Sequence, residues 1–178
     1  AADRRGSVHA MAERASSSIA PINLEIPLDG QFNEAEAKLT FARFGIPSVR
    51  EAVVSAPEQA QRVARDMGAH VVLKVLSRSV THKSEMGGVA VNVPSEEVGT
   101  RALAMAETFN ARAGTPPEGF LIQEMIVGGT EMILGFHRDP QLGPALLLGM
   151  GGVTAELFKD TALRLLPIGR DEALGMLK

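Results

Sequence analysis

The sequence predicts an α+β protein in two lobes, with helices concentrated in the first half of the chain and strands in the second. Amphipathic helical patterns with capping residues recur between residues 33 and 113. Beyond residue 119, short apolar runs are separated by turns rich in glycine and proline, which is typical of strands. Helices segregated from strands indicate an α+β architecture. We therefore expect a connector over residues 1–31, a first lobe over about 32–119 and a second over about 120–178.

Composition excludes several classes of protein. The chain has 178 residues, 45% of them hydrophobic, and a net charge of −3. It has no long basic run, and its seven aromatic residues are all Phe, which argues against nucleic-acid binding. No apolar stretch is long enough to span a membrane, and no segment resembles a signal peptide. The absence of cysteine excludes disulfides and thiolate metal sites, and it is compatible with a cytoplasmic enzyme.

The first helix is predicted to begin at Asn33, because Glu36 follows three residues later in a capping-box arrangement. Gly45 and Pro47 end it. Its apolar side chains occupy more than one face: Ala35, Leu39, Ala42, Phe41 and Phe44. We therefore expect both sides of this helix to be covered.

Two more helices follow the same logic. Ser55 and Glu58 suggest a second capping box, and Gly68 ends that helix. Ser95 begins a third helix with one apolar stripe, formed by Val98, Ala102, Met105, Ala106 and Phe109.

The remaining short apolar runs are predicted strands. They are Val49–Val54, Phe120–Ile126, Thr130–His137, Ala145–Leu148, Val153–Phe158 and Ala162–Leu166. Residues 171–178 begin a last helix that we expect to continue past the end of the chain.

The densest chemistry lies in and after the apolar run Val71–Leu76, which contains Lys74. Such a run indicates a buried strand, where an unpaired ammonium is costly. Lys74 should therefore meet an anion, either a carboxylate of the protein or a phosphate of a ligand. The polar loop Ser77–Met86 follows, and Gly87-Gly88 then opens another strand, where backbone N–H groups could approach a ligand.

His82, in that loop, has two interpretations. A histidine beside a lysine on a loop is most often simply exposed. Alternatively, a neutral imidazole can act as a nucleophile and carry a transferred group. No His-x-x-His or similar spacing indicates a transition-metal site.

Weaker signals lie in the second half. A hairpin that brings Glu124 and Glu131 to one cleft could bind a purine and a ribose, but solvated strand-edge carboxylates fit the spacing equally well. Residues 149–152 could form a phosphate nest or an ordinary glycine-rich turn. The charged residues Glu156, Lys159, Asp160 and Arg164 suggest a solvated face on spacing alone.

Four segments together resemble one family, the ATP-grasp domain of NDP-forming acyl-CoA synthetases (ADP-forming acetate–CoA ligases), related to succinyl-CoA synthetase. The matching segments are NEAEAKLTFARFGIPSV, VVLKVLS with THKSEMGGV, LIQEMIVGGTEMILGFHRDPQLGPALLLGMGG and ELFKDTALRLLPI. They follow the family's order and run from about Asn33 to Leu177, roughly four-fifths of the chain.

The resemblance implies a two-lobed ATP-grasp fold, incomplete at its C-terminus, and a set of site residues. Lys74 would reach the nucleotide phosphates, and His82 would relay a phosphoryl group to or from the nucleotide. The adenine pocket would be lined by Gln123, Glu124, Met125 and Ile126. The ribose would be contacted by Glu131. The phosphates would also lie near Gly87, Gly88, Gly151, Gly152 and Arg164.

The resemblance also implies the reaction and its partners. Acyl-CoA, ADP and phosphate would be interconverted with a carboxylic acid, CoA and ATP through a phosphohistidine, with Mg²⁺ and positioning supplying most of the catalysis. Glu156 and Asp160 are not expected to be the metal pair, so the metal ligands are unknown. CoA-binding and ligase modules on the same polypeptide or a partner subunit would be needed, and an oligomer is expected. The chain would then be a piece of a longer protein.

Two alternatives from other functional classes stay open. The chain could be a regulatory ATP-grasp module in a fused protein lysine acetyltransferase, where His82 has no catalytic duty. It could instead be a non-catalytic assembly domain that docks partners through its strand-rich half.

Overall fold

The computed structural model describes residues 32–80, 83–152 and 161–178, and these divide into two compact units between Val127 and Gly128. We call residues up to Val127 the first unit and residues from Gly128 the second unit. Their elements, in chain order, are α2 (Glu34–Ala42), β1 (Glu51–Val54), α3 (Pro57–Met67), β2 (His70–Leu76), β3 (Val89–Pro94), a 3₁₀ turn (Ser95–Glu97), α4 (Val98–Ala113), β4 (Gly119–Glu124), β5 (Met132–Asp139), β6 (Gly143–Met150), β7 (Thr161–Leu165) and α6 (Arg170–Gly175).

The first unit is built on a four-stranded antiparallel sheet in the order β1-β4-β2-β3. The third strand in sequence, β3, carries an extra residue opposite β2, and Asn92 takes the left-handed conformation there with φ 54°. β4 lies between β1 and β2, so it belongs to this sheet and not to a second lobe that starts near residue 120. Its pattern of buried residues identifies a central strand, but nothing local specifies which sheet a strand joins.

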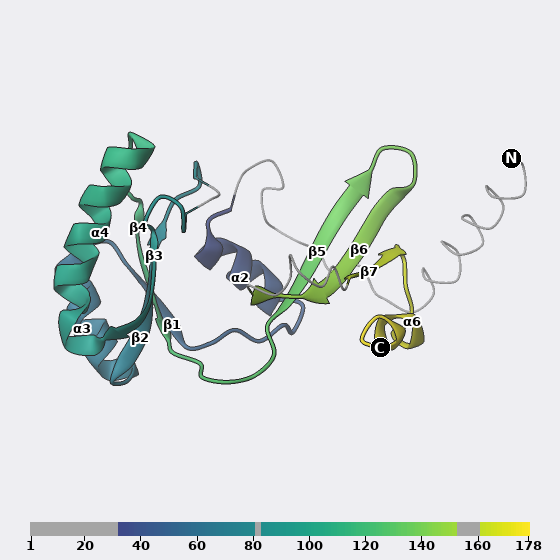
Figure 1. Cartoon of the computed structure of the whole chain (residues 1–178), viewed down its shortest axis with the longest axis horizontal. Helices are drawn as coiled ribbons and strands as arrows, with labels where there is room; N and C mark the ends of the chain where they lie inside the picture. Colours follow the sequence, from purple (N-terminus) through teal and green to yellow (C-terminus); the bar gives the residue numbers. More distant parts are fainter. Residues whose placement is uncertain (1–31, 81–82, 153–160) are drawn as a thin grey trace, which may run out of the picture. The chain divides into compact units, whose positions relative to one another are not determined.

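Helices α3 and α4 cover one face of this sheet (Figure 1). β2 alternates as a strand must, so that Val71, Leu73 and Val75 point to this face and are fully buried. The predicted stripe of α4 packs there as expected, with Val98, Ala102, Met105 and Phe109 buried. This face holds the main core of the first unit.

Helix α2 lies on the opposite face (Figure 1). There Ala35 packs with Leu76 and Leu121 in a small buried cluster. Lys74 also belongs to this face, because it lies one position from the buried Leu73 and Val75 and is opposite Leu121 in the register. The strand therefore presents its lysine towards α2.

The two predicted capping boxes have different outcomes. The box at the start of α2 is confirmed: Asn33 Oδ1 accepts from the Glu36 N–H at 3.1 Å, and Glu36 Oε2 accepts from the Asn33 N–H at 3.0 Å. The box from Ser55 to Glu58 is wrong. The N-cap of α3 is Ala56, which has no side-chain cap, and Ser55 bonds instead to Gln59 Oε1.

The expectation that both sides of α2 are covered is also wrong within the described residues. Leu39 is 71% exposed, and Phe41 and Phe44 are 45% and 47% exposed. Only Ala35 of this helix is buried, because the sheet meets a single narrow strip of it.

The second unit contains a three-stranded antiparallel sheet in the order β5-β6-β7 and the short helix α6. Large apolar side chains stay exposed on both faces of this sheet, including Leu134, Phe136 and Leu163. The expected strand at Val153–Phe158 lies outside the described residues. The last helix starts as expected, but it ends at Gly175 before the chain does.

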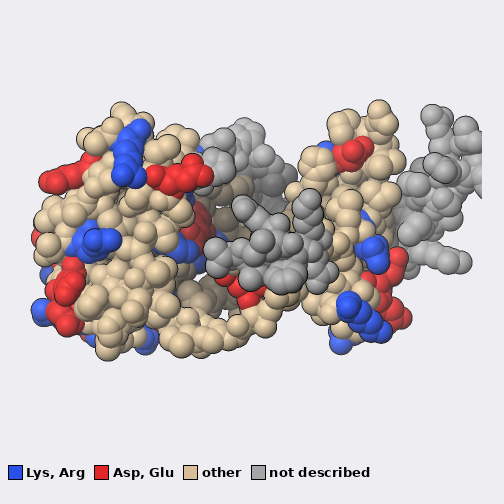
Figure 2. Space-filling view, viewed as in Figure 1, with Lys and Arg blue, Asp and Glu red and all other residues tan. Residues whose placement is uncertain are grey.

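Charges are mixed over the surface. In Figure 2 the Lys and Arg side chains of the first unit alternate with Asp and Glu on the face shown. None of the helices among the described residues is both long and apolar enough to cross a membrane.

Candidate functional site

Lys74 meets a carboxylate of the protein. Its Nζ lies 2.6 Å from Oε1 of Glu34, the first residue of α2, and both side chains are about a quarter exposed (24% and 28%). The sequence allowed either a carboxylate of the protein or a ligand phosphate as the partner of Lys74. In this structure the partner is the carboxylate of Glu34. The pair joins β2 to α2 across the face that α3 and α4 do not cover.

The pair is one end of a longer polar chain. Lys38 Nζ lies 3.0 Å from the same Glu34 oxygen and 2.9 Å from Oε2 of Glu51 on β1. Gln123 on β4, predicted to line the adenine pocket, donates from Nε2 to that Glu51 oxygen at 2.7 Å. Two ammonium groups and two carboxylates thus alternate, and their charges sum to zero.

The charges respond to this arrangement. Burial alone would raise the pKa of the Glu34 carboxyl, but hydrogen bonds and charges from Lys74 and Lys38 outweigh it and hold that pKa below its ordinary value. Burial alone would lower the pKa of Lys38, but Glu51 and Glu34 outweigh it and raise that pKa. Both residues are therefore held in their charged forms.

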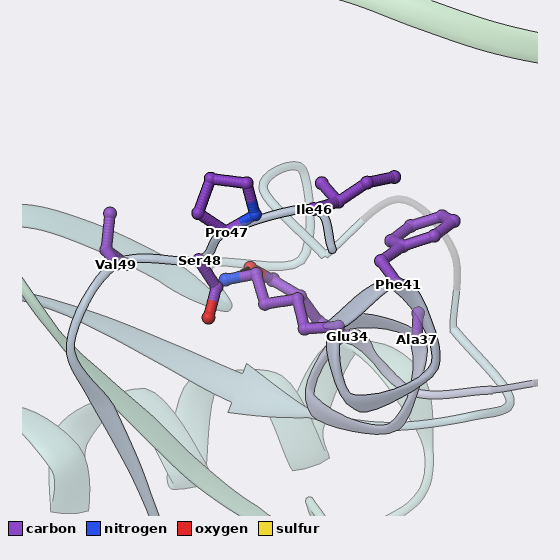
Figure 3. A pocket seen from close by; sticks show the side chains of 8 residues that line it. Glu34, Ala37, Phe41, Ile46, Pro47, Ser48 and Val49 are labelled. Atoms are coloured by element: carbon purple, nitrogen blue, oxygen red, sulfur yellow. Dashed lines mark ion pairs between the residues drawn. The ribbon is translucent and has the colours of Figure 1, made fainter. Parts of the chain in front are cut away.

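Two cavities meet at Glu34. The first, about 420 Å³, lies between α2 and the segment that follows it, and Figure 3 shows Phe41, Ile46 and Pro47 on its apolar side. Glu34 and Lys38 supply its charged side chains. The second, about 350 Å³, is lined by Asn33, Glu34, Ala37 and the start of the loop after β2, including Ser77, Arg78 and Lys83.

Arg78 is held at the rim of the second cavity. Its guanidinium pairs with Glu36 of α2 and with Glu118 before β4. It therefore clamps the start of the loop to α2.

Beyond Gln123, the structure differs from the hairpin that could bring Glu124 and Glu131 to one cleft. No hairpin joins β4 to β5, because β4 pairs with β1 and β2 while β5 pairs with β6. Glu124 Oε1 accepts from the Arg50 N–H at 2.7 Å, so this carboxylate is engaged with the backbone before β1. Met125 is half-buried and Ile126 is 58% exposed in the segment after β4.

Glu131 lies in the second unit with two of the predicted phosphate glycines. Its carbonyl accepts from the Gly151 N–H at 2.8 Å. A Cβ on Gly151 would lie 2.8 Å from Glu131 Cγ, and one on Gly152 would lie 3.0 Å from its Oε2. Arg164 is exposed on β7, where its Nη1 donates to the Leu163 carbonyl at 2.8 Å.

The glycines of the loop after β2 close the loop itself. The Gly88 N–H donates to the Lys83 carbonyl at 2.7 Å, and the Gly87 N–H donates to the Ser84 carbonyl at 3.1 Å. These N–H groups are thus engaged within the loop. His82 lies outside the described residues, as do Glu156 and Asp160.

Within the ranges 32–80, 83–152 and 161–178, no three His, Asp or Glu side chains come together as metal ligands. We therefore assign no metal ligand.

Glu34, Lys38 and Glu51 were missed as site residues. Two features of the sequence pointed to this cluster. Glu34 and Lys38 are four residues apart in a predicted helix, a spacing that favours an ion pair. Lys74 in its apolar strand also required an anionic partner, and Glu34 is that partner. The sequence did not indicate that this helix packs on the strand that carries Lys74.

Comparison with known proteins gives a consistent result. The sequence model of a protein family described as an ATP-grasp domain matches residues 28–178 of this chain. The chain is similar to the ADP-forming acetate–CoA ligase I of Archaeoglobus fulgidus, with 38% identity over 153 residues, 84% of this chain and 22% of the relative. It is also similar to the β subunit of the ADP-forming acetate–CoA ligase I of Pyrococcus furiosus, with 35% identity over 82% of this chain and 63% of the subunit.

Solved structures agree with these relatives. The dinucleotide-forming acetyl-coenzyme A synthetase 1 of Ca. Korarchaeum cryptofilum, in complex with coenzyme A and Ca-AMPCP, matches with a TM-score of 0.75 and 38% identity, over 82% of this chain and 65% of that one. Another structure of that protein holds Mg-AMPPCP, with its phosphohistidine segment pointing towards the nucleotide binding site; it matches with a TM-score of 0.62 and 37% identity, over 81% of this chain and 61% of that one.

The chain thus spans about a fifth of the single-chain ligase and less than two thirds of the separate β subunit. Its mixed α+β structure follows ATP-grasp structures over about four-fifths of its length. It also matches the β subunit of a succinate–CoA ligase, at 24% identity. The chain belongs to the ATP-grasp family. It is an ATP-grasp domain of the kind found in ADP-forming acetate– and acyl-CoA ligases, and this kind of domain is related to the β subunit of succinyl-CoA synthetase.

Proposed function

We propose that this chain is the nucleotide-binding part of an ADP-forming acyl-CoA synthetase. It would interconvert ATP and ADP while CoA-binding and ligase modules, on the same polypeptide or on a partner subunit, handle the acyl group. The observation that carries the proposal is the partly exposed ammonium of Lys74, set in a buried strand of an ATP-grasp domain and directed to a carboxylate that lines two cavities.

The nucleotide phosphates are proposed to lie by Lys74. An ammonium donates charge-assisted hydrogen bonds to phosphate oxygens, each worth roughly 1.5–3 kcal/mol. Gln123 is buried on the same face of the sheet, where it fixes Glu51. Within the second unit, Glu131 lies against the Gly151-Gly152 turn, and the ribose contact implied by the family resemblance stays a proposal for Glu131.

His82 is the proposed phosphoryl carrier, on the basis of its HKSE motif after the lysine-bearing strand. Its neutral imidazole nitrogen would attack the γ-phosphorus of ATP, so that a P–N bond forms and the P–O bond to ADP breaks. In the opposite direction ADP would take the phosphoryl group from the histidine. The acyl phosphate that supplies or receives this group would lie on the ligase module.

Nucleotide binding is tested by titration calorimetry with ATP. Lys74→Ala should weaken ATP affinity by about tenfold or more, since one charge-assisted contact is lost. Lys178→Ala, which removes an exposed lysine, is the matched control and should bind like the wild type. Equal affinities of Lys74→Ala and the wild type would show that Lys74 is only a structural ion pair.

The relay is tested on the chain together with its CoA-binding and ligase modules, incubated with γ-labelled ATP and magnesium. Acid-labile, base-stable label should appear and be lost in His82→Asn, whereas His137→Asn, which changes an exposed histidine on β5, should keep it. Label that persists in His82→Asn would remove the relay role from this histidine. Label absent from the wild-type protein would also overturn the relay and would favour the regulatory alternative.

A further inference from the structure

Two lysines converge on a single oxygen of the protein. Lys74 Nζ and Lys38 Nζ lie 2.6 and 3.0 Å from Oε1 of Glu34. The ammonium groups come from different elements, β2 and α2, and are 36 positions apart in the sequence. One carboxylate oxygen therefore receives two charge-assisted hydrogen bonds, an arrangement that also suits a phosphate oxygen.

Lys38 does not depend on Glu34 for its position. Its Nζ also contacts Glu51 Oε2 at 2.9 Å, and the buried Gln123 holds that oxygen at 2.7 Å. If Glu34 leaves, Glu51 and Gln123 still keep Lys38 on this face of the sheet. The remaining cluster then carries two positive charges and one negative charge.

Glu34 has space to leave. It is the first residue of α2, its side chain is 28% exposed, and it lines cavities of about 420 and 350 Å³. Its carboxylate is also held charged by the two lysines. An incoming polyphosphate next to an ionised carboxylate would be repelled, so the two anions must exchange at this position.

From these contacts we infer that Glu34 is an exchangeable internal anion in a two-lysine phosphate site, and that Lys38 is a second phosphate-binding residue beside Lys74. This inference rests on the proposed nucleotide-binding function. It adds Lys38 as a phosphate-binding residue and Glu34 as an anion that competes with the phosphate for the two lysines. Glu51 and Gln123 are positioning residues for Lys38. The ligand class is the polyphosphate portion of a nucleoside di- or triphosphate.

The test measures dissociation constants for tripolyphosphate and for ATP by titration calorimetry. Glu34→Ala and Glu34→Gln both remove the competing charge, and Gln also keeps the shape of the side chain. Each should bind tripolyphosphate about tenfold tighter than the wild type. Glu107→Ala, which removes an exposed carboxylate on α4, is the control and should not change the affinity.

Lys38 is tested in the Glu34→Ala background, where no internal anion competes. Lys38→Met should weaken tripolyphosphate binding about tenfold, and Lys38→Arg should restore most of it because the positive charge is kept. A purely structural Lys38 would change the thermal midpoint but not the dissociation constant.

The outcomes separate this inference from the proposed function. If ATP binds no tighter than tripolyphosphate in any variant while Glu34→Ala still binds tripolyphosphate more tightly, the nucleotide function fails and the anion site stands. If ATP binds the wild type but the Glu34 and Lys38 variants leave every affinity unchanged, the inference is overturned and the function stands.

Discussion

At the scale of single residues, Lys74 shows how far chemistry can be deduced without a fold. An ammonium in an apolar strand needs an anion wherever the strand lies, because its desolvation must be offset. The identity of that anion was open. Glu34 lies 40 positions away in sequence and becomes the partner only because α2 packs on the lysine side of β2.

The Glu34 pair makes folding stability depend on pH. The folded-state pKa of Glu34 is lowered, so its contribution is fully present above the ordinary Glu value of about 4.3 and is lost as the pH falls through the lower folded-state pKa. Between pH 6 and pH 3 we expect the wild type to lose on the order of 1 kcal/mol more stability than Glu34→Gln.

Urea unfolding midpoints at a series of pH values measure this difference. Glu107→Gln, which changes an exposed carboxylate, should follow the wild-type curve. Parallel curves for the wild type and Glu34→Gln would contradict the proposed role of the pair in stability.

A second residue-scale prediction concerns Gly88. A Cβ there would lie 2.9 Å from the Lys83 carbonyl oxygen and 3.4 Å from Val75 Cβ, and the backbone oxygen cannot move without opening the loop. Gly88→Ala should therefore destabilise the protein by about 1–3 kcal/mol in urea unfolding. Gly175→Ala has open space around its Cβ and is the control. An unchanged midpoint in Gly88→Ala would show that the loop rearranges freely.

At the scale of elements, helix starts were predicted well where a side chain could reach its own backbone. Asn33 and Glu36 satisfy each other within one turn, so the sequence alone is sufficient. Ser55 and Glu58 have the same spacing, but the helix begins after Ala56, and Gln59 captures both the Ser55 N–H and its hydroxyl. A one-residue shift of the start removes a box that the spacing allows.

This difference gives a paired prediction. Asn33→Ala removes a working cap and should cost about 1 kcal/mol, whereas Ser55→Ala removes no cap and should cost less than about 0.5 kcal/mol. Both substitutions are compared by chemical unfolding monitored by circular dichroism. Equal losses would mean that the cap of α2 contributes little to the stability of the first unit.

At the scale of the whole molecule, the two sheets differ in how they are covered. β2 and β4 are central strands with residues such as Leu73 and Leu121 fully buried, whereas β7 pairs only with β6 among the described strands and exposes Leu163 and Leu165. A strand buried on both faces opens only with its unit, but an exposed strand can open locally.

Hydrogen exchange should reveal this difference. Amides of β2 and β4 should exchange at least about tenfold more slowly than those of β7, as measured on peptides by mass spectrometry. The edge strand β3 serves as an internal reference for edge position within the first unit. Protection of β7 equal to that of β4 would show that the second sheet is covered more fully than its exposed side chains indicate.

The sequence by itself determined the local features: the central strand with its lysine, the α4 stripe, the capped start of α2, and the motifs of the ATP-grasp family. These depend on periodicity and on contacts within a few residues, which are written directly in the order of side chains. Only the tertiary structure decided that β4 completes the first sheet, that no hairpin joins Glu124 to Glu131, and that Glu34 and Lys38 meet Lys74. These pairings and contacts join segments far apart in the chain: β4 pairs with β1 and β2, and α2 packs on the lysine side of β2. No local pattern specifies which distant segments meet.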